Sequence, residues 1–153
     1  MSRIMPHITG IVVLAFLTAA ATELAQHGLL TSTGETFTRR AATILAIVST
    51  PLLLALASRN RISADRLGLP IWRRAMGTVS IVMIAVVWVL FLAAQITAPA
   101  SATYWFGLDL FPTLLVCNVA GFVFAFGPRG APRSQQIAAA LFVWSWLQAN
   151  IYR

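Results

Sequence analysis

The sequence predicts an all-α membrane protein, a single domain over residues 1–153 that forms a bundle of about five transmembrane helices with a cytoplasmic N-terminus. Of the 153 residues, 59% are hydrophobic and 10% are charged, whereas a soluble domain usually carries about 25% charged residues. The apolar runs are about 17 to 20 residues long, which suits a hydrocarbon core of about 30 Å. All eleven basic residues are arginines near the ends of these runs. Membrane topology explains this placement, so we expect no nucleic-acid partner.

The first two spans are predicted at residues 8–26 and 41–57. The apolar part of the first is longer than the hydrophobic region of a secretory signal peptide, so we expect a retained helix. A connection rich in threonine, serine and glycine, 27–40, is predicted to be a loop. The second span contains Pro51, which lacks the amide hydrogen that would donate a helix hydrogen bond, so we expect a kink there.

The segment 58–77 is predicted to be a loop between the second and third spans. An arginine at the bilayer centre costs at least about 2.5 kcal/mol, so this segment cannot lie in hydrocarbon. By the positive-inside rule it faces the cytoplasm together with Arg3, Arg129 and Arg133, which leaves three arginines outside. The residues of this segment that set the topology are Arg59, Arg61, Arg66, Arg73 and Arg74.

Three further spans are predicted at residues 76–94, 108–126 and 136–151. The first contains no charge, the second has Asp109 in its first turns, and the last is short. An uncharged connection at 95–105 separates the first two, and a stop rich in glycine and proline precedes the last. Aromatic rings prefer the membrane–water boundary. We therefore expect interfacial belts or lipid contacts at most of the five tryptophans, Trp72, Trp88, Trp105, Trp144 and Trp146.

His7 and His27 are the heme candidates, because neutral imidazole is a common ligand of iron. They are 20 residues apart, which is roughly 30 Å along a helix, so they cannot share one metal. A heme between helices would need a ligand from a facing helix, and the sequence has no third histidine. The alternative is that both are interfacial histidines, and we expect no metal site.

Glu23, Asp109, Cys117 and Asn118 are the polar residues predicted at membrane depth. An acid there is a candidate for proton or quinone chemistry. The alternative is that Glu23 pairs with His27 four residues later, and that Asp109 caps the start of its helix. Cys117 and Asn118 lie mid-span, where polar side chains usually bond to a neighbouring helix. No Walker loop, HExxH, GxSxG or CxxC motif occurs, so no catalytic residue is assigned.

Five short segments follow one another in an informative order. They are HITG at 7–10, HGLL at 27–30, TRRAATILAIVSTPL at 38–52, RLGLPIWRRAMG at 66–77 and RSQQIAAAL at 133–141. This order resembles the ferric reductase-like transmembrane family, and is nearest to the heme-binding membrane subunit of bacterial methionine sulfoxide reductase systems. The resemblance implies a helical bundle that binds b-type heme, with an Arg-Arg-x-x-Gly run before a heme-ligating helix.

The heme ligands that this resemblance implies are missing. Val87 and Trp88 stand where the family places a histidine on its third helix, and Ala138 and Ile151 stand at the positions on its last helix. The family uses two axial imidazoles for each heme, and neither apolar side chains nor tryptophan can replace them. The resemblance therefore supports the fold and argues against the redox activity.

We therefore expect a non-catalytic integral membrane subunit of the bacterial inner membrane that carries no cofactor. Its partners would be lipid and the other membrane subunits of a respiratory or photosynthetic complex, which it would stabilise. The alternative is an electron-transfer protein that binds heme b or a quinone, with His7 or His27 paired across a dimer. A small transporter is a third class, which needs polar groups near mid-membrane. The residues that could supply them are Cys117, Asn118 and helix hydroxyls such as Ser49, Thr50 and Ser80.

Overall fold

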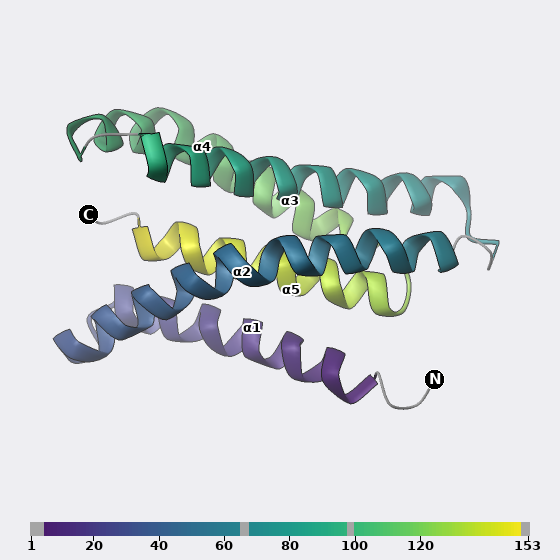
Figure 1. The fold of residues 1–153 in the computed structure, drawn as a ribbon, viewed down its shortest axis with the longest axis horizontal. Helices are drawn as coiled ribbons and strands as arrows, with labels where there is room; N and C mark the ends of the chain where they lie inside the picture. Colours follow the sequence, from purple (N-terminus) through teal and green to yellow (C-terminus); the bar gives the residue numbers. More distant parts are fainter. Residues whose placement is uncertain (1–4, 65–67, 98–99, 151–153) are drawn as a thin grey trace.

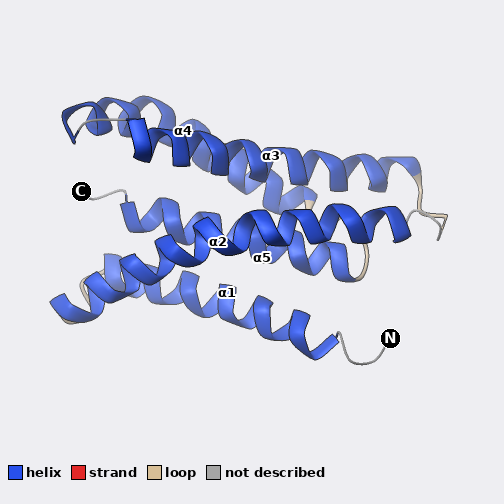
Figure 2. Ribbon diagram, viewed as in Figure 1, coloured by secondary structure: helices blue, strands red, loops and turns tan. Residues whose placement is uncertain are grey.

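The computed structural model describes residues 5–64, 68–97 and 100–150 and confirms the predicted fold class, an all-α membrane bundle (Figures 1 and 2). The described residues form five helices and no strand. Each helix runs antiparallel to the one before it, so α1 begins at one end of the bundle and α5 ends at the other (Figure 1). The helices are α1 (Met5–Gln26), α2 (Ser32–Ala64), α3 (Ile71–Thr97), α4 (Ala100–Phe124) and α5 (Ala131–Asn150).

Helix α5 lies at the centre of the bundle and contacts all four other helices. Its largest buried apolar side chains are Phe142, Trp146 and Leu147, which are almost completely enclosed. Ala138, Ala139 and Ala140 are buried as well, and such small residues let helix backbones approach closely inside a membrane. The core is therefore built around α5.

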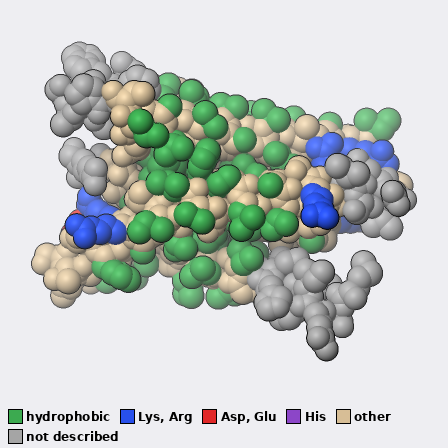
Figure 3. All heavy atoms as spheres, in the orientation of Figure 1, with side chains coloured by type: hydrophobic (Ala, Val, Ile, Leu, Met, Phe, Trp, Pro, Cys, Tyr) green, Lys and Arg blue, Asp and Glu red, His purple; other side chains and the backbone are tan. Residues whose placement is uncertain are grey.

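The outer helices present apolar side chains to the surroundings. Helices α1, α2 and α3 contain stretches long and apolar enough to cross a membrane, and α4 has a shorter apolar stretch, Leu110–Phe124. Large side chains such as Phe16, Val48 and Val116 are more than half exposed, and apolar side chains cover much of the visible surface (Figure 3). In water such a surface would be unfavourable, whereas lipid covers it at no cost.

Helix α5 is the least expected member of the bundle. It contains Gln135, Gln136 and Gln148 and is not among the described helices that are apolar enough to cross a membrane by composition. Its neighbours shield it from lipid on most sides, so its polar side chains can be satisfied within the protein. Burial in the bundle, rather than hydropathy, places this helix.

The predicted connections on either side of the second span were too long. Helix α2 begins at Ser32 and ends at Ala64, so much of 27–40 and the start of 58–77 are helical. Thr31 caps its start, where the Gly34 amide donates to the threonine hydroxyl over 3.3 Å. Polar composition predicts water exposure at these positions, but it does not distinguish a loop from a helix that extends beyond the bilayer.

The helices that correspond to the last three predicted spans have different bounds from those spans. Helix α3 begins at Ile71 and extends to Thr97, and α4 begins at Ala100, so most of the predicted connection 95–105 is helical. Helix α5 begins at Ala131, five residues before the predicted span. Pro132 lies in its first turn, where a proline needs no hydrogen-bonded amide and already has the helical φ. In the sequence, prolines and small residues suggested breaks at positions where the structure continues the helix.

The prediction that the tryptophans mostly lie at interfaces or face lipid does not extend to Trp146, which is 0% exposed. Its ring packs edge-on against Phe91 of α3, with 4.7 Å between the ring centroids. Trp88 and Trp144 are half-buried, and Trp72 is exposed. The side chain of Trp105 lies outside the described residues.

Candidate functional site

The described arginines gather mainly at one end of the bundle, which we name the arginine end. It comprises the end of α2, the start of α3 and the corner between α4 and α5. Arg59 and Arg61 belong to α2, and Arg73 and Arg74 belong to the first turn of α3, so four of the predicted topology residues lie on helices rather than in a loop. Arg66 lies outside the described residues. Arg129 and Arg133 complete the cluster.

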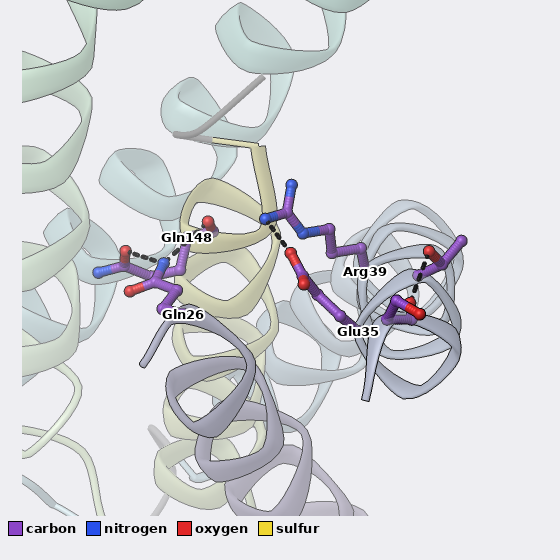
Figure 4. A network of polar contacts seen from close by, with 6 residues as sticks. Gln26, Glu35, Arg39 and Gln148 are labelled. Atoms are coloured by element: carbon purple, nitrogen blue, oxygen red, sulfur yellow. Dashed lines mark hydrogen bonds and ion pairs between the residues drawn. The ribbon is translucent and has the colours of Figure 1, made fainter. Parts of the chain in front are cut away.

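At the opposite end, polar side chains join α1 to α5. The Gln26 side-chain amide donates to the backbone oxygen of Gln148 over 2.9 Å and to its Oε1 over 2.6 Å (Figure 4). Close by, the Trp144 indole N–H donates to Oε1 of Glu23 over 3.1 Å. Glu35 and Arg39 form a separate ion pair on α2, with 2.6 Å between Oε1 and Nη2 (Figure 4).

Glu23 has a different partner from the one predicted. Its carboxylate accepts the hydrogen bond of Trp144, 121 residues away, while the expected partner His27 is exposed just after the end of α1. The backbone amide of His27 donates to the Glu23 carbonyl, as a helix end requires. The predicted alternative of local pairing with His27 was therefore wrong, because α5 supplies a donor directly.

The remaining acid at membrane depth, Asp109, cannot cap the start of its helix. Helix α4 begins at Ala100, nine residues earlier, so Asp109 lies well beyond the first turn, where a capping side chain acts. Its side chain lies outside the described residues. The prediction of a cap depended on a boundary that the structure moves.

Asn118 and Cys117 lie at the interface of α4 with the core. The buried Asn118 amide donates to the Ala140 carbonyl of α5 over 3.2 Å, which confirms the prediction that it bonds to a neighbouring helix. Cys117 is half-buried and packs against the hydrophobic core, also as predicted.

His7 and His27 lie at opposite ends of α1, at its third residue and directly after its last. The side chain of His7 lies outside the described residues. Across the described part of the chain, no group of three or more histidine, cysteine, aspartate or glutamate residues could hold a metal ion. Because they lie at opposite ends of one helix of 22 residues, the two histidines are separate features of the bundle.

Three more hydrogen bonds join helices through side chains. The Trp88 indole N–H donates to the Ala46 carbonyl of α2 over 3.2 Å. The buried Ser80 hydroxyl donates to the Gly121 carbonyl of α4 over 2.7 Å. At the arginine end, the Asn60 amide donates to Oε1 of Gln135 over 3.2 Å, joining α2 to α5. Polar side chains at several positions along the bundle thus form hydrogen bonds between helices.

Gln136 is a buried polar residue that sequence reasoning missed. It is 0% exposed, and neither Oε1 nor Nε2 has a hydrogen-bond partner among the described residues. Thr50 Oγ1, Asn118 Oδ1 and Trp146 Nε1 share this property. A glutamine pair before an alanine-rich run is the signal that could have drawn attention to it. These atoms are costly to bury, because each exchanges water for an apolar surrounding.

Comparison with known proteins adds no relative: no family model matches the chain, and neither the curated proteins nor the solved structures yield a match. The resemblance to the ferric reductase-like family therefore stays a prediction from short segments.

Proposed function

We propose that this chain is a non-catalytic integral membrane subunit that packs in, and stabilises, a larger complex of the bacterial inner membrane, of the respiratory or photosynthetic kind. The observation that carries this proposal is that polar residues near the membrane interior form hydrogen bonds to a neighbouring helix. Glu23 and Asn118, two of the polar residues predicted at membrane depth, each bond to α5. A polar group engaged with a neighbouring helix fixes helix arrangement, which is what a structural subunit needs.

The packing around α5 supports the same role. Phe142, Trp146 and Leu147 fill the centre of the bundle, and the α1, α2 and α3 faces that carry Phe16, Val48 and Val82 remain exposed. Apolar outer faces of this kind are available both to lipid and to transmembrane helices of other subunits.

We further propose a topology of five spans with a cytoplasmic N-terminus. The arginine end then faces the cytoplasm, in agreement with the positive-inside rule. Helix α5, with 20 residues, is long enough to cross a core of about 30 Å at about 1.5 Å per residue. Its low hydropathy is compatible with a span because other helices enclose it.

Blue-native electrophoresis of gently solubilised membranes tests the proposed subunit role. We expect a tagged chain at its native level of expression to migrate in a species much larger than its own mass. A photo-crosslinking residue in place of the exposed Val82 should capture another membrane protein, whereas one in place of the buried Val87 should not. Migration solely as a free small protein, with no specific crosslink, would contradict the proposal.

The second candidate is an electron-transfer protein that binds heme b or a quinone. The exposure of His27 favours it, because an exposed imidazole is accessible to a heme shared with a second copy of the chain. Purified protein from heme-replete cells would then show a reduced α-band that His27→Ala or His7→Ala removes. A colourless preparation would exclude the heme form of this candidate.

A further inference from the structure

The corner between α4 and α5 sits directly on the first turns of α3. A Cβ atom added to Gly127 would lie 2.5 Å from Met76 Cβ and 3.3 Å from the Arg73 carbonyl oxygen. A Cβ added to Gly77 would lie 3.3 Å from Cγ of Pro128. This close approach places the backbone of Arg73 against the corner that carries Arg129, although 56 residues separate the two arginines in the sequence.

Two of the arginines at this corner lie over aromatic rings. The guanidinium carbon of Arg73 is 4.8 Å from the centroid of the Trp72 ring, and that of Arg133 is 4.7 Å from the centroid of the Phe126 ring. A ring face attracts a cation and restricts its orientation. Trp72 is 56% exposed and Phe126 is 45% exposed, so both pairs lie on the outer surface of the bundle.

Each arginine–aromatic pair stands at the end of an exposed apolar stripe. On α3, Trp72 is followed at intervals of seven residues by Val79 and Val86, which share its face of the helix. On α4, a matching exposed stripe of Val116, Val119 and Val123 leads to Phe126. A cationic group above an apolar stripe matches a phospholipid, which has an anionic phosphate above acyl chains.

The two acids whose side chains the structure describes do not pair with Arg73, Arg129 or Arg133. Glu23 and Glu35, the two acids whose side chains the structure describes, belong to the opposite end of the bundle. The described ion pair, Glu35 with Arg39, lies at that opposite end as well. Blue arginine surface is visible at the arginine end in Figure 3. In the sequence, the segment 58–77 carries five arginines and one acid, Asp65, and the corner adds Arg129 and Arg133. This end therefore has an excess of positive charge, which attracts an anion.

We propose that Arg73, Arg129 and Arg133, with Trp72 and Phe126, form a binding site for the phosphate headgroup of an anionic phospholipid. The guanidinium groups donate paired hydrogen bonds to the phosphate oxygens, a geometry that lysine cannot reproduce. The aromatic rings hold two of these groups at the level of the headgroups, and the valine stripes contact the acyl chains. The lipid would bridge the start of α3 and the α4–α5 corner.

Native mass spectrometry of the purified full-length chain tests this site. The protein is supplied with equal amounts of phosphatidylglycerol and phosphatidylcholine, and the retained lipids are counted. We expect preferential retention of phosphatidylglycerol, which Arg73→Gln combined with Arg133→Gln should weaken by about fivefold per arginine. Arg40→Gln, an exposed arginine of α2 at the opposite end, is the matched control and should leave retention unchanged.

Two further measurements distinguish this site from general charge attraction and from the binding of free phosphate. The Arg73→Lys, Arg133→Lys variant keeps the charge, and should retain less phosphatidylglycerol than the native chain and more than the glutamine variant. Inorganic phosphate at millimolar concentration should not displace the lipid. Equal retention of both lipids by the native chain, an equal loss in the Arg40→Gln control, or displacement by inorganic phosphate would overturn the proposal.

Discussion

Trp144 of α5 donates its indole N–H to Oε1 of Glu23 in α1, over 3.1 Å. One turn further along both helices, Gln26 bonds to Gln148. The two contacts join residues that are 121 and 122 positions apart in the sequence. Both therefore set the same register of α1 against the central helix α5. They also account for an acidic side chain near the end of a membrane helix without invoking chemistry.

The Trp144→Phe variant should lower the stability of the bundle by about 1 kcal/mol. The substitution keeps the aromatic packing but removes the donor, so the half-buried Glu23 carboxylate loses its bond. The measurement is thermal or denaturant unfolding in detergent micelles. Trp72→Phe is the control, because Trp72 is exposed and has no such bond among its described contacts. An equal loss in both variants would show that the hydrogen bond is not responsible.

The adjacent residues Gln135 and Gln136 should respond in opposite directions to replacement by methionine. Gln136→Met should be neutral or should stabilise the protein by about 1 kcal/mol, because it removes buried polar atoms that have no described partner. Gln135→Met should destabilise it by about 1 kcal/mol, because the bond to Asn60 is lost.

The two methionine variants have similar side-chain volumes and lie on the same helix, so each controls for the other in the same unfolding measurement. A substantial loss of stability in Gln136→Met would show that Gln136 makes a stabilising contact of its own.

Gly127→Ala should destabilise the protein by about 1 to 3 kcal/mol. The new Cβ would lie 2.5 Å from Met76 Cβ, an overlap that forces the corner away from α3. Gly10→Ala is the matched control, since a Cβ at Gly10 in α1 meets nothing within 4 Å. Alanine is the better helix former there, so this control should be neutral or slightly stabilising. If the unfolding temperatures of both variants changed equally, the close packing of Gly127 against Met76 would be contradicted.

Arginine charge should control the orientation of the bundle in a graded way. With Arg73 and Arg74 both changed to glutamate, a reporter fused after Arg133 should stay cytoplasmic, because other arginines remain at the same end. Neutralising all five arginines of the segment 58–77 should give a mixture of orientations. Protease protection of the reporter in spheroplasts measures both. A single clean topology in the five-fold variant would contradict the role assigned to this segment.

The helical class and the clustered arginines could be predicted from the sequence because both depend on local composition. The ends of the helices were harder to predict. The residues 32–40 are polar yet helical, since a helix that leaves the bilayer can continue in water with a threonine cap and a Glu35–Arg39 pair. Hydropathy reports where lipid ends, whereas hydrogen bonding decides where a helix ends.

The candidate site divides in the same way. Glu23 and Asn118 could be singled out from the sequence, because polar side chains within apolar runs are conspicuous. Their partners, Trp144 and the Ala140 carbonyl, lie 121 and 22 residues away and could not be predicted from spacing on one helix. Gln136 escaped attention because its complete burial depends on the packing of other helices around α5.

By itself, the sequence determined that this chain is an all-α membrane protein and that its arginines mark one end, because a lipid environment imposes both on short stretches of residues. The tertiary structure alone decided that α5, the helix with the weakest membrane signal, occupies the centre. It also decided that Arg73 meets the corner that carries Arg129. The physical reason is that close packing joins residues far apart in the chain. The free energy of this packing depends on which helices contact each other and cannot be assigned to a single helix.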